Sequence, residues 1–428
     1  MEIYSELKKR EANNNKIKVG LVGAGQMGTD IASLSASMPG LDIAAVADIK
    51  LENAKKSYSL AGKRNDDIYE SSSRTEIEDY VAQNKAVITA DSQLITEVEN
   101  IDVIIDATGI PEVGAELGLN SIMNGKDIVM MNVEADVVVG PILNKMAKKA
   151  GVVYTGAAGD EPAAIMELYN YAKSLGLEVV AAGKGKNNPL QYTANPDNVA
   201  EIAKEKGTTP EMLTCFMDGT KTMVEMAAVS NATGLVPDVL GMHGPTSNID
   251  DLAKTFSLKE QGGILNNTGR VDYSLGNVAP GVFVIVTTNN QRVKDSFAYS
   301  KMGDGPNYLL YRPYHLVSLE TPISAARAVI NNEATIAPEK GLVSETITVA
   351  KKDLKKGEAL DGIGGFTVHG SIASRSRAKK DNLLPLGLTH GAVMKTAAKK
   401  GDLLSYDMVE LKKDSIIYQL RMIQEKML

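Results

Sequence analysis

Residues 16–31 read KIKVGLVGAGQMGTDI and decide the fold of the first third of the chain. A short β-branched run meets Gly23, Gly25 and Gly28, and apolar residues at helical spacing follow. This order of strand, tight turn and helix is that of the dinucleotide-binding fingerprint. Gly23 permits the turn, Gly25 lets the backbone approach a pyrophosphate, and Gly28 lets helix and strand pack closely. The helix N-terminus would offer unpaired N–H groups to the phosphates.

An acidic residue at the end of the next predicted strand supports a dinucleotide site. The run LDIAAVADI brings Asp48 to a position about 20 residues beyond the third glycine, where a carboxylate accepts hydrogen bonds from ribose hydroxyls. That spacing favours NAD. Lys50, Lys55 and Lys56 follow closely and could neutralise a 2'-phosphate, so the sequence leaves both NAD and NADP open.

Further strands continue the pattern and predict a Rossmann-type, doubly wound parallel sheet to about residue 155. IDVIIDATG (101–109) and KDIVMMNVEAD (126–136) are strands whose carboxyl ends would lie at the ligand edge of the sheet. The polar piece from 57 to 91 is interpreted as an insertion with a helix near 73–83. The predicted cofactor-binding residues are Gly23, Gly25, Gln26, Met27, Gly28, Asp48, Thr108, Gly109 and Glu134.

A second stretch, VVAAGKGKNNPL (179–190), resembles a strand end that opens into a glycine-rich loop. Lys184 and Lys186 alternate with glycines, so in an extended segment both would project to one side. Two ammonium groups with Asn187 and Asn188 beside them suit a phosphate or a carboxylate. The alternative is a solvated loop, because loop lysines are usually exposed.

The stretch CFMDGTKTMVE (215–225) predicts a helix with a polar stripe. Asp218, Lys221 and Glu225 recur at steps of three and four, which puts them on one helix face. Such a stripe could move protons to and from substrate hydroxyls or bind a divalent metal. The alternative is an exposed surface of salt bridges. The neighbouring Cys215 is interpreted as buried and inert.

Other polar residues are candidates with an equally plain structural explanation. His243 lies between glycines and could reach a substrate, or it could be an ordinary surface histidine. Asp160 and Glu161 could bind a metal or orient a nicotinamide, or they could favour the N-terminus of the helix that follows.

Taken together, these motifs resemble the homoserine dehydrogenase-like oxidoreductases with a C-terminal SAF domain. The glycine loop, DATG, MNVEAD, GDEP, GKGKNN and FMDGTKTMVEM carry the resemblance, which covers nearly the whole chain. It is nearest to the 1-deoxy-D-xylulose 5-phosphate reductoisomerase-like enzymes. Homoserine dehydrogenases typically have a lysine where this chain has Glu134, and this charge reversal argues against homoserine as the substrate.

The resemblance implies an NAD(P)-dependent oxidoreductase, reductoisomerase-like, that acts on a phosphorylated or acidic polyhydroxy carbonyl compound. It implies catalytic roles for Asp218 and Lys221, and Lys184 and Glu225 are the further catalytic candidates. In a reductoisomerase a divalent ion, Mg or Mn, polarises two substrate oxygens. Asp160, Glu161, Asp218 and Glu225 would be its ligands, with Lys186, Asn187, Asn188 and His243 binding substrate. The alternatives are a homoserine dehydrogenase and a non-catalytic NAD(P)-sensing protein.

The same reading divides the chain into three domains. Residues 1–155 would bind the dinucleotide, and 156–338 would form an α+β substrate domain with a helix that returns to the first domain. Residues 339–428 change character: short strands alternate with glycines, and the sequence K-K-G-[DE]-x-L occurs twice. They resemble a SAF domain, a small β-clip module, for which we expect a covering or oligomerising role.

Composition excludes several other classes of protein. The chain has 428 residues, a formal net charge of -7 and 5% aromatic residues, which gives no support for a nucleic-acid partner. One cysteine and four scattered histidines exclude a disulfide framework and a zinc-type site. No signal peptide or membrane span is predicted. We expect a cytoplasmic homo-oligomer with a small-molecule substrate.

Overall fold

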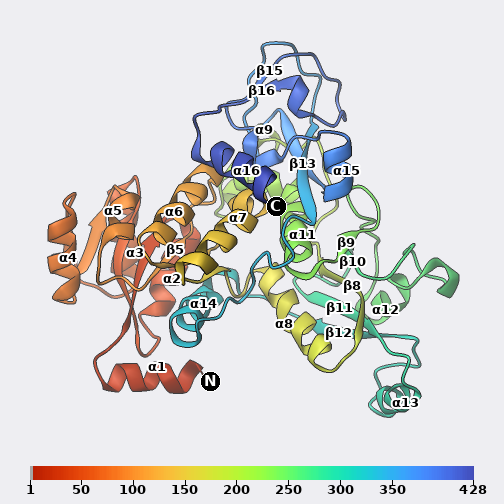
Figure 1. Cartoon of the computed structure of the whole chain (residues 1–428), viewed down its shortest axis with the longest axis horizontal. Coiled ribbons are helices and arrows are strands. Elements are labelled where there is room, and N and C mark those ends of the chain that lie inside the picture. The colour runs from red at the N-terminus through yellow and green to blue at the C-terminus, as the bar shows by residue number, and fades with distance from the viewer. Residues whose placement is uncertain (1–2) are drawn as a thin grey trace. The chain divides into compact units, whose positions relative to one another are not determined.

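The computed structural model describes residues 3–428, which form two compact units. Unit 1 comprises residues 3–163, 316–337 and 419–428, and unit 2 comprises 164–315 and 338–418. After its first segment in each unit, the chain therefore returns twice to unit 1 and once to unit 2. Figure 1 colours the chain by residue number and labels the elements of both units.

Unit 1 is an α/β fold around a seven-stranded sheet, as the sequence predicts for its first part. Its strands are β1 (Ile17–Val22), β2 (Leu41–Ala47), β3 (Ile68–Glu70), β4 (Ala86–Thr89), β5 (Val103–Asp106), β6 (Asp127–Met130) and β7 (Tyr154–Gly156). Every pairing is parallel, in the order β3-β4-β2-β1-β5-β6-β7. The order reverses at β1, so the loop after β1 lies at the switch point where doubly wound folds bind ligands.

Helices connect these strands and cover the sheet of unit 1. They are α1 (Ile3–Ala12), α2 (Gln26–Ser35), α3 (Leu51–Leu60), α4 (Arg74–Ala82), α5 (Ser92–Glu97), α6 (Pro111–Met123) and α7 (Val133–Ala150), with α14 (Val317–Asn331) and α16 (Ile416–Met427) from later in the chain. Helix α14 packs against α2, and Figure 1 shows its blue-green ribbon beside the red N-terminal elements. Apolar residues of β1, β2 and β5 form the core, each strand being buried on both faces.

The interpretation of residues 57–91 as an insertion is wrong. Helix α4 lies where the helix was predicted, but β3 and β4 flank it and extend the sheet beyond β2. These strands have only three and four residues. Their apolar runs are therefore too short to stand out from the polar residues around them.

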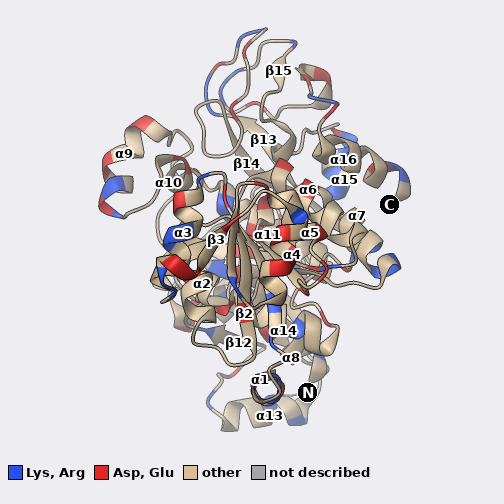
Figure 2. Cartoon of the chain, turned by 90° about the vertical axis from the view of Figure 1, so that its left-hand side faces the viewer, with Lys and Arg blue, Asp and Glu red and all other residues tan. Residues whose placement is uncertain are grey.

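Unit 2 contains a five-stranded mixed sheet in the order β12-β11-β8-β10-β9. Its strands are β8 (Glu178–Gly185), β9 (Val236–Pro237), β10 (Arg270–Ser274), β11 (Val282–Thr287) and β12 (Asn307–Arg312). Its helices are α8 (Glu161–Ser174, which begins in unit 1), α9 (Pro196–Glu205), α10 (Pro210–Met217), α11 (Thr220–Thr233), α12 (Leu252–Thr255) and α13 (Gln291–Tyr299). In Figure 2, where acidic residues are red and basic residues are blue, both colours appear on the ribbon of α9.

The C-terminal part of unit 2 is built from short β segments. They are β13 (Ser344–Ala350), β14 (Val368–Ser374), β15 (Val393–Met394) and β16 (Val409–Glu410), with helix α15 (Arg375–Lys380). Strands β13 and β14 pair in antiparallel fashion and both pack against α11. Residues 338–418 thus share one compact unit with 164–315, whereas α14 belongs to unit 1.

Candidate active site

The glycine loop after β1 is shaped by two close approaches of the backbone. Gly23 has φ +90°, a conformation that side chains disfavour. A Cβ added at Gly28 would lie 1.9 Å from the Gly23 carbonyl oxygen, so only glycine lets α2 start this close to β1. A Cβ added at Gly25 would meet nothing within 4 Å. The loop therefore leaves open space at Gly25, directly before Gln26 and Met27, the first residues of α2.

Asp48 holds the same loop from the end of β2. Its Oδ2 accepts a hydrogen bond of 2.8 Å from the Ala24 N–H, and its Oδ1 accepts one of 2.8 Å from the Lys50 N–H. The carboxylate thus lies against the glycine loop, where a ribose would follow a pyrophosphate. Lys50, Lys55 and Lys56 are exposed.

A buried network of polar side chains lies at the carboxyl ends of β5 and β6. Asp106 accepts hydrogen bonds from the Thr108 hydroxyl (2.6 Å) and from the Asn132 amide (3.1 Å). Asn132 also caps α7 by accepting from the Ala135 N–H at 3.2 Å. Burial raises the pKa of Asp106 despite these donors. Glu134 does not lie at a strand end as predicted but in the first turn of α7, where it is buried.

The two lysines of the stretch 179–190, Lys184 and Lys186, are buried in unit 2. The glycines 183 and 185 are part of β8, so the predicted glycine-rich loop is wrong in this respect. Gly183 must be small because a Cβ there would lie 2.1 Å from the Asp272 carbonyl oxygen. Lys184 and Lys186 are 7% and 5% exposed, which excludes a solvated loop. Asn187 is exposed and Asn188 half-buried.

The two lysines differ in their partners. Lys184 forms a buried ion pair with Glu225 of α11. Lys186 donates to the Phe216 carbonyl oxygen at 2.8 Å and lies 3.5 Å from the Asn188 Oδ1. Among residues 3–428, no carboxylate lies within ion-pair distance of Lys186. Burial, together with the charge of Lys184, lowers the pKa of Lys186 to about 8.

The predicted helical stripe is only partly correct. Asp218 does not belong to α11 but follows α10, and Gly219 with φ +89° separates the two helices. Asp218 and Glu225 are fully buried, so an exposed salt-bridged surface is excluded, whereas Lys221 is half-buried. The break arises because Gly219 adopts a left-handed conformation that ends one helix before the next begins.

Two residues from the C-terminal part complete this polar cluster and were missed in the sequence. Lys351, directly after β13, forms an ion pair of 2.7 Å with the Asp218 Oδ2. His369 of β14 is buried, and its ring packs at a tilt against that of Tyr192, with centroids 4.9 Å apart. Burial lowers the pKa of His369, although the charge of Asp218 opposes this. No local pattern distinguishes Lys351 from the exposed lysines around it.

His243 lies in a separate polar cluster. Its Nε2 is 2.9 Å from the Asp238 carboxylate, and its N–H donates to Asp272 at 3.0 Å. Asp272 pairs with Gly183, whereas Tyr273 pairs with Lys184. Because side chains alternate along a strand, Asp272 and Lys184 point to opposite faces of the sheet. The structure therefore does not bring His243 together with Lys184, and its substrate-binding role stays a prediction.

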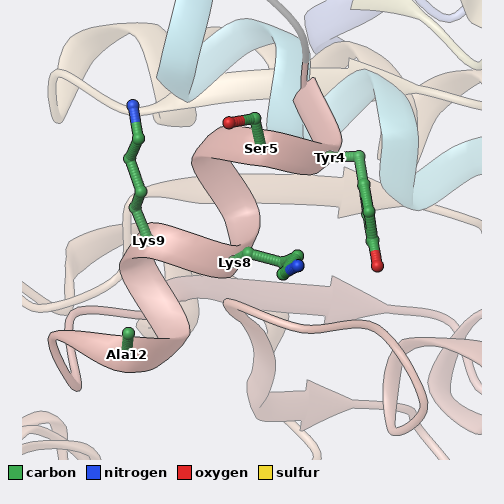
Figure 3. A pocket seen from close by; sticks show the side chains of 5 residues that line it. All are labelled: Tyr4, Ser5, Lys8, Lys9 and Ala12. Atoms are coloured by element: carbon green, nitrogen blue, oxygen red, sulfur yellow. The ribbon is translucent and has the colours of Figure 1, made fainter.

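The remaining sites carry less information. Asp160 and Glu161 are buried at the start of α8, and their role in metal binding stays a prediction. An open hollow on α1 is lined by Tyr4, Ser5, Lys8, Lys9 and Ala12 (Figure 3). Its side chains come from one helix and do not converge, so it offers no chemistry. Cys215 is buried, as predicted, and so are Met223 and Met226 of α11.

Two family models match successive parts of the chain. Residues 23–155 match the NAD-binding domain of homoserine dehydrogenase. Residues 159–321 match the catalytic domain of oxidoreductase DRL. The chain carries the domains of an NAD(P)-dependent oxidoreductase. Neither match extends beyond residue 321, so the SAF resemblance of residues 339–428 stays a prediction.

Solved structures of dehydrogenases are also similar. A probable dehydrogenase from Thermotoga maritima is 13% identical over 76% of this chain and 92% of that chain, with a TM-score of 0.40. Levoglucosan dehydrogenase, solved with NADH and L-sorbose, is 18% identical over 42% of this chain and 46% of that chain (TM-score 0.28). WlbA dehydrogenase from Bordetella pertussis, solved with NADH and UDP-GlcNAcA, is 16% identical over 41% and 49% (TM-score 0.29). In the last two matches this chain spans less than half of the other chain.

A comparison with curated proteins gave no match. Within residues 3–428, no helix combines the length and the apolar character that crossing a bilayer requires.

Proposed function

We propose that this oxidoreductase uses NAD and acts on a small carbonyl compound, or its alcohol, that carries a carboxylate or phosphate group. The observation that carries the proposal is the buried Lys186 of unit 2, which has no carboxylate within ion-pair distance among residues 3–428. Two lysines of the cluster pair with buried carboxylates, Lys184 with Glu225 and Lys351 with Asp218. The hydrogen-bond partners of Lys186, by contrast, are neutral oxygens, those of the Asn188 side chain and the Phe216 carbonyl.

A buried ammonium group without a counter-ion is costly to maintain. Desolvation disfavours its charged form, and the neighbouring Lys184 adds repulsion. An anionic group of a ligand would supply the missing charge and favour the protonated lysine. A hydrogen bond between two charged groups is also stronger than one between neutral groups. The cluster thus favours an acidic ligand over a neutral one.

Other residues of the cluster could assist the transfer of a hydride to or from the substrate. Bound nicotinamide supplies or takes the hydride at the carbonyl carbon. Lys184 and Lys186 project to the same side of β8 because one residue separates them. Lys184 would donate a hydrogen bond to the carbonyl oxygen and stabilise the developing alkoxide. Its ion pair with Glu225 keeps this ammonium group oriented.

NAD is preferred over NADP in this proposal because of Asp48. Its carboxylate is fixed against the glycine loop by two backbone N–H groups. It would accept hydrogen bonds from ribose hydroxyls but repel a 2'-phosphate. We expect NADH to bind more tightly than NADPH, and Asp48→Gly to reduce that difference about tenfold or more. An equal affinity of the wild type for both cofactors, measured by fluorescence titration, would contradict this assignment.

The substrate class is tested with matched pairs of compounds. NADH oxidation is followed with glyceraldehyde 3-phosphate and with uncharged glyceraldehyde. The same assay with 1-deoxy-D-xylulose 5-phosphate tests for a reductoisomerase activity. NAD reduction is followed with homoserine. We expect turnover of anionic carbonyl compounds and little turnover of neutral ones. Turnover of homoserine alone would support the homoserine dehydrogenase alternative, and cofactor binding without any turnover would support a sensor.

Lys186→Met tests the anion-binding residue itself. Losing one charge-assisted hydrogen bond of about 1.5 to 3 kcal/mol should raise KM for the anionic substrate about 10- to 150-fold. KM for NADH should not change. Lys206→Met, which removes an exposed lysine of unit 2, is the matched control. An unchanged KM in the Lys186→Met variant would overturn the proposed anion site.

A further inference from the structure

The ion pair of Lys351 and Asp218 is unusually well enclosed. The two side chains are 3% and 0% exposed, and the Nζ–Oδ2 distance is 2.7 Å. Lys351 also donates to the carbonyl oxygens of Ala194 (2.8 Å) and Gly365 (2.7 Å). The three protons of the ammonium group therefore have three acceptors, and its position is fixed from three sides.

Such a pair is poor evidence for a purely stabilising role. Desolvating two ions costs several kcal/mol each, and well-packed apolar residues of similar volume are often equally stable. Asp218 is moreover held on its second oxygen, because Oδ1 accepts from the Thr220 N–H at 2.8 Å. The Thr220 hydroxyl in turn accepts from the Gly370 N–H of β14 at 2.8 Å. Contacts on both oxygens thus fix the orientation of the Asp218 carboxylate.

The fixed carboxylate acts on the groups around it. Its charge favours the protonated form of Lys186 and of His369. Lys186 has neutral oxygens as its hydrogen-bond partners, and His369 is buried near the Lys351–Asp218 pair. Asp218 therefore connects the lysine motif of β8 to the residues that 338–418 contribute.

We propose that Lys351 is a positioning residue of the oxidoreductase. By holding the Asp218 carboxylate in a fixed position and orientation, it maintains the electrostatic field in which the substrate's anionic group and oxygen are bound. Residues 338–418 are then part of the catalytic unit, because they supply Lys351 and the strand that holds Thr220. This inference rests on the proposed function and adds the C-terminal segment to it.

The test compares Lys351→Met, which removes the charge at similar volume, with Lys351→Arg, which keeps it. NADH oxidation with glyceraldehyde 3-phosphate gives kcat and KM, and NADH titration checks that unit 1 is intact. We expect Lys351→Met to lower kcat/KM at least 100-fold without changing NADH affinity, and Lys351→Arg to recover at least a tenth of the wild-type value. Lys352→Met, which removes an exposed lysine paired with Glu358, should behave as wild type.

A double variant separates positioning from folding. Lys351→Met leaves the Asp218 carboxylate buried without its counter-ion and should lower Tm, whereas Lys351→Met/Asp218→Asn removes both charges and should restore it. We expect the double variant to regain Tm but not kcat/KM. Recovery of both, or an unchanged kcat/KM in Lys351→Met, would overturn the inference alone. A wild type that turns over no carbonyl compound would overturn the proposed function as well.

Discussion

The strongest structural prediction concerns Gln424 and helix α7. Pro141 interrupts α7 and has no N–H to donate. The side-chain amide of Gln424, from α16, accepts a hydrogen bond from the Ile142 N–H at 3.0 Å and donates to the Val138 carbonyl at 2.9 Å. It thus bridges two groups that an uninterrupted helix joins directly. Gln424 is 1% exposed, so no solvent competes for these bonds.

The substitution Gln424→Met keeps the volume of the side chain and removes both hydrogen bonds. Leaving the buried Ile142 N–H without this acceptor costs about 1 to 3 kcal/mol. The Val138 carbonyl loses less, about 0.5 to 1.5 kcal/mol, because Arg421 still donates to it at 3.3 Å. We therefore expect α7 to lose about 2 to 4 kcal/mol of protection.

Hydrogen exchange of the peptides that cover 133–150 measures this loss locally. The exchange rate should rise about 30- to 1,000-fold, since 1.4 kcal/mol corresponds to a factor of ten. The control is Lys426→Ala, which changes an exposed residue of α16, the helix of Gln424. It should leave the exchange rate of α7 unchanged. A loss below about 0.5 kcal/mol in Gln424→Met would refute the bridging role.

Three further predictions follow from single contacts. Gly28→Ala should destabilise unit 1 because its Cβ would lie 1.9 Å from a backbone oxygen, whereas Gly25→Ala should keep Tm and abolish NADH binding. Sulfate should raise Tm below about pH 8 and lose this effect as Lys186 deprotonates above it, and Lys186→Met should show no such pH dependence. Burial raises the pKa of Asp272 to about 6, so the folded state binds the proton more tightly; its contribution to stability should fall from about pH 4 to 6, a slope absent in Asp272→Asn denaturation curves.

The cofactor end of the molecule could be predicted from sequence because its geometry is local. The three glycines of the first loop, the strand before them and Asp48 lie within about one βαβ unit, so their spacing fixes their arrangement. The structure has Gly23 at positive φ, Gly28 in close contact, and Asp48 bonded to the loop. The short strands β3 and β4 were not predicted, because three or four residues are too few to show a periodic pattern.

The lysine motif shows the limit of that reasoning. The alternation of Lys184 and Lys186 with glycines was visible, but a strand and a loop with the same residues cannot be told apart without the neighbouring strands. Pairing of β8 with β10 and β11 buries the motif and makes its charge costly. The same pairing separates His243 from Lys184, which no spacing along the chain could indicate.

The amino-acid sequence by itself determined that this protein has a dinucleotide loop, an acidic ribose partner and two alternating lysines, since each depends on residues close together in the chain. Only the tertiary structure decided that Lys351 faces Asp218 and that Lys186 lacks a carboxylate partner within residues 3–428. Ion pairing depends on distance in space and on burial, and folding sets both through contacts between distant segments.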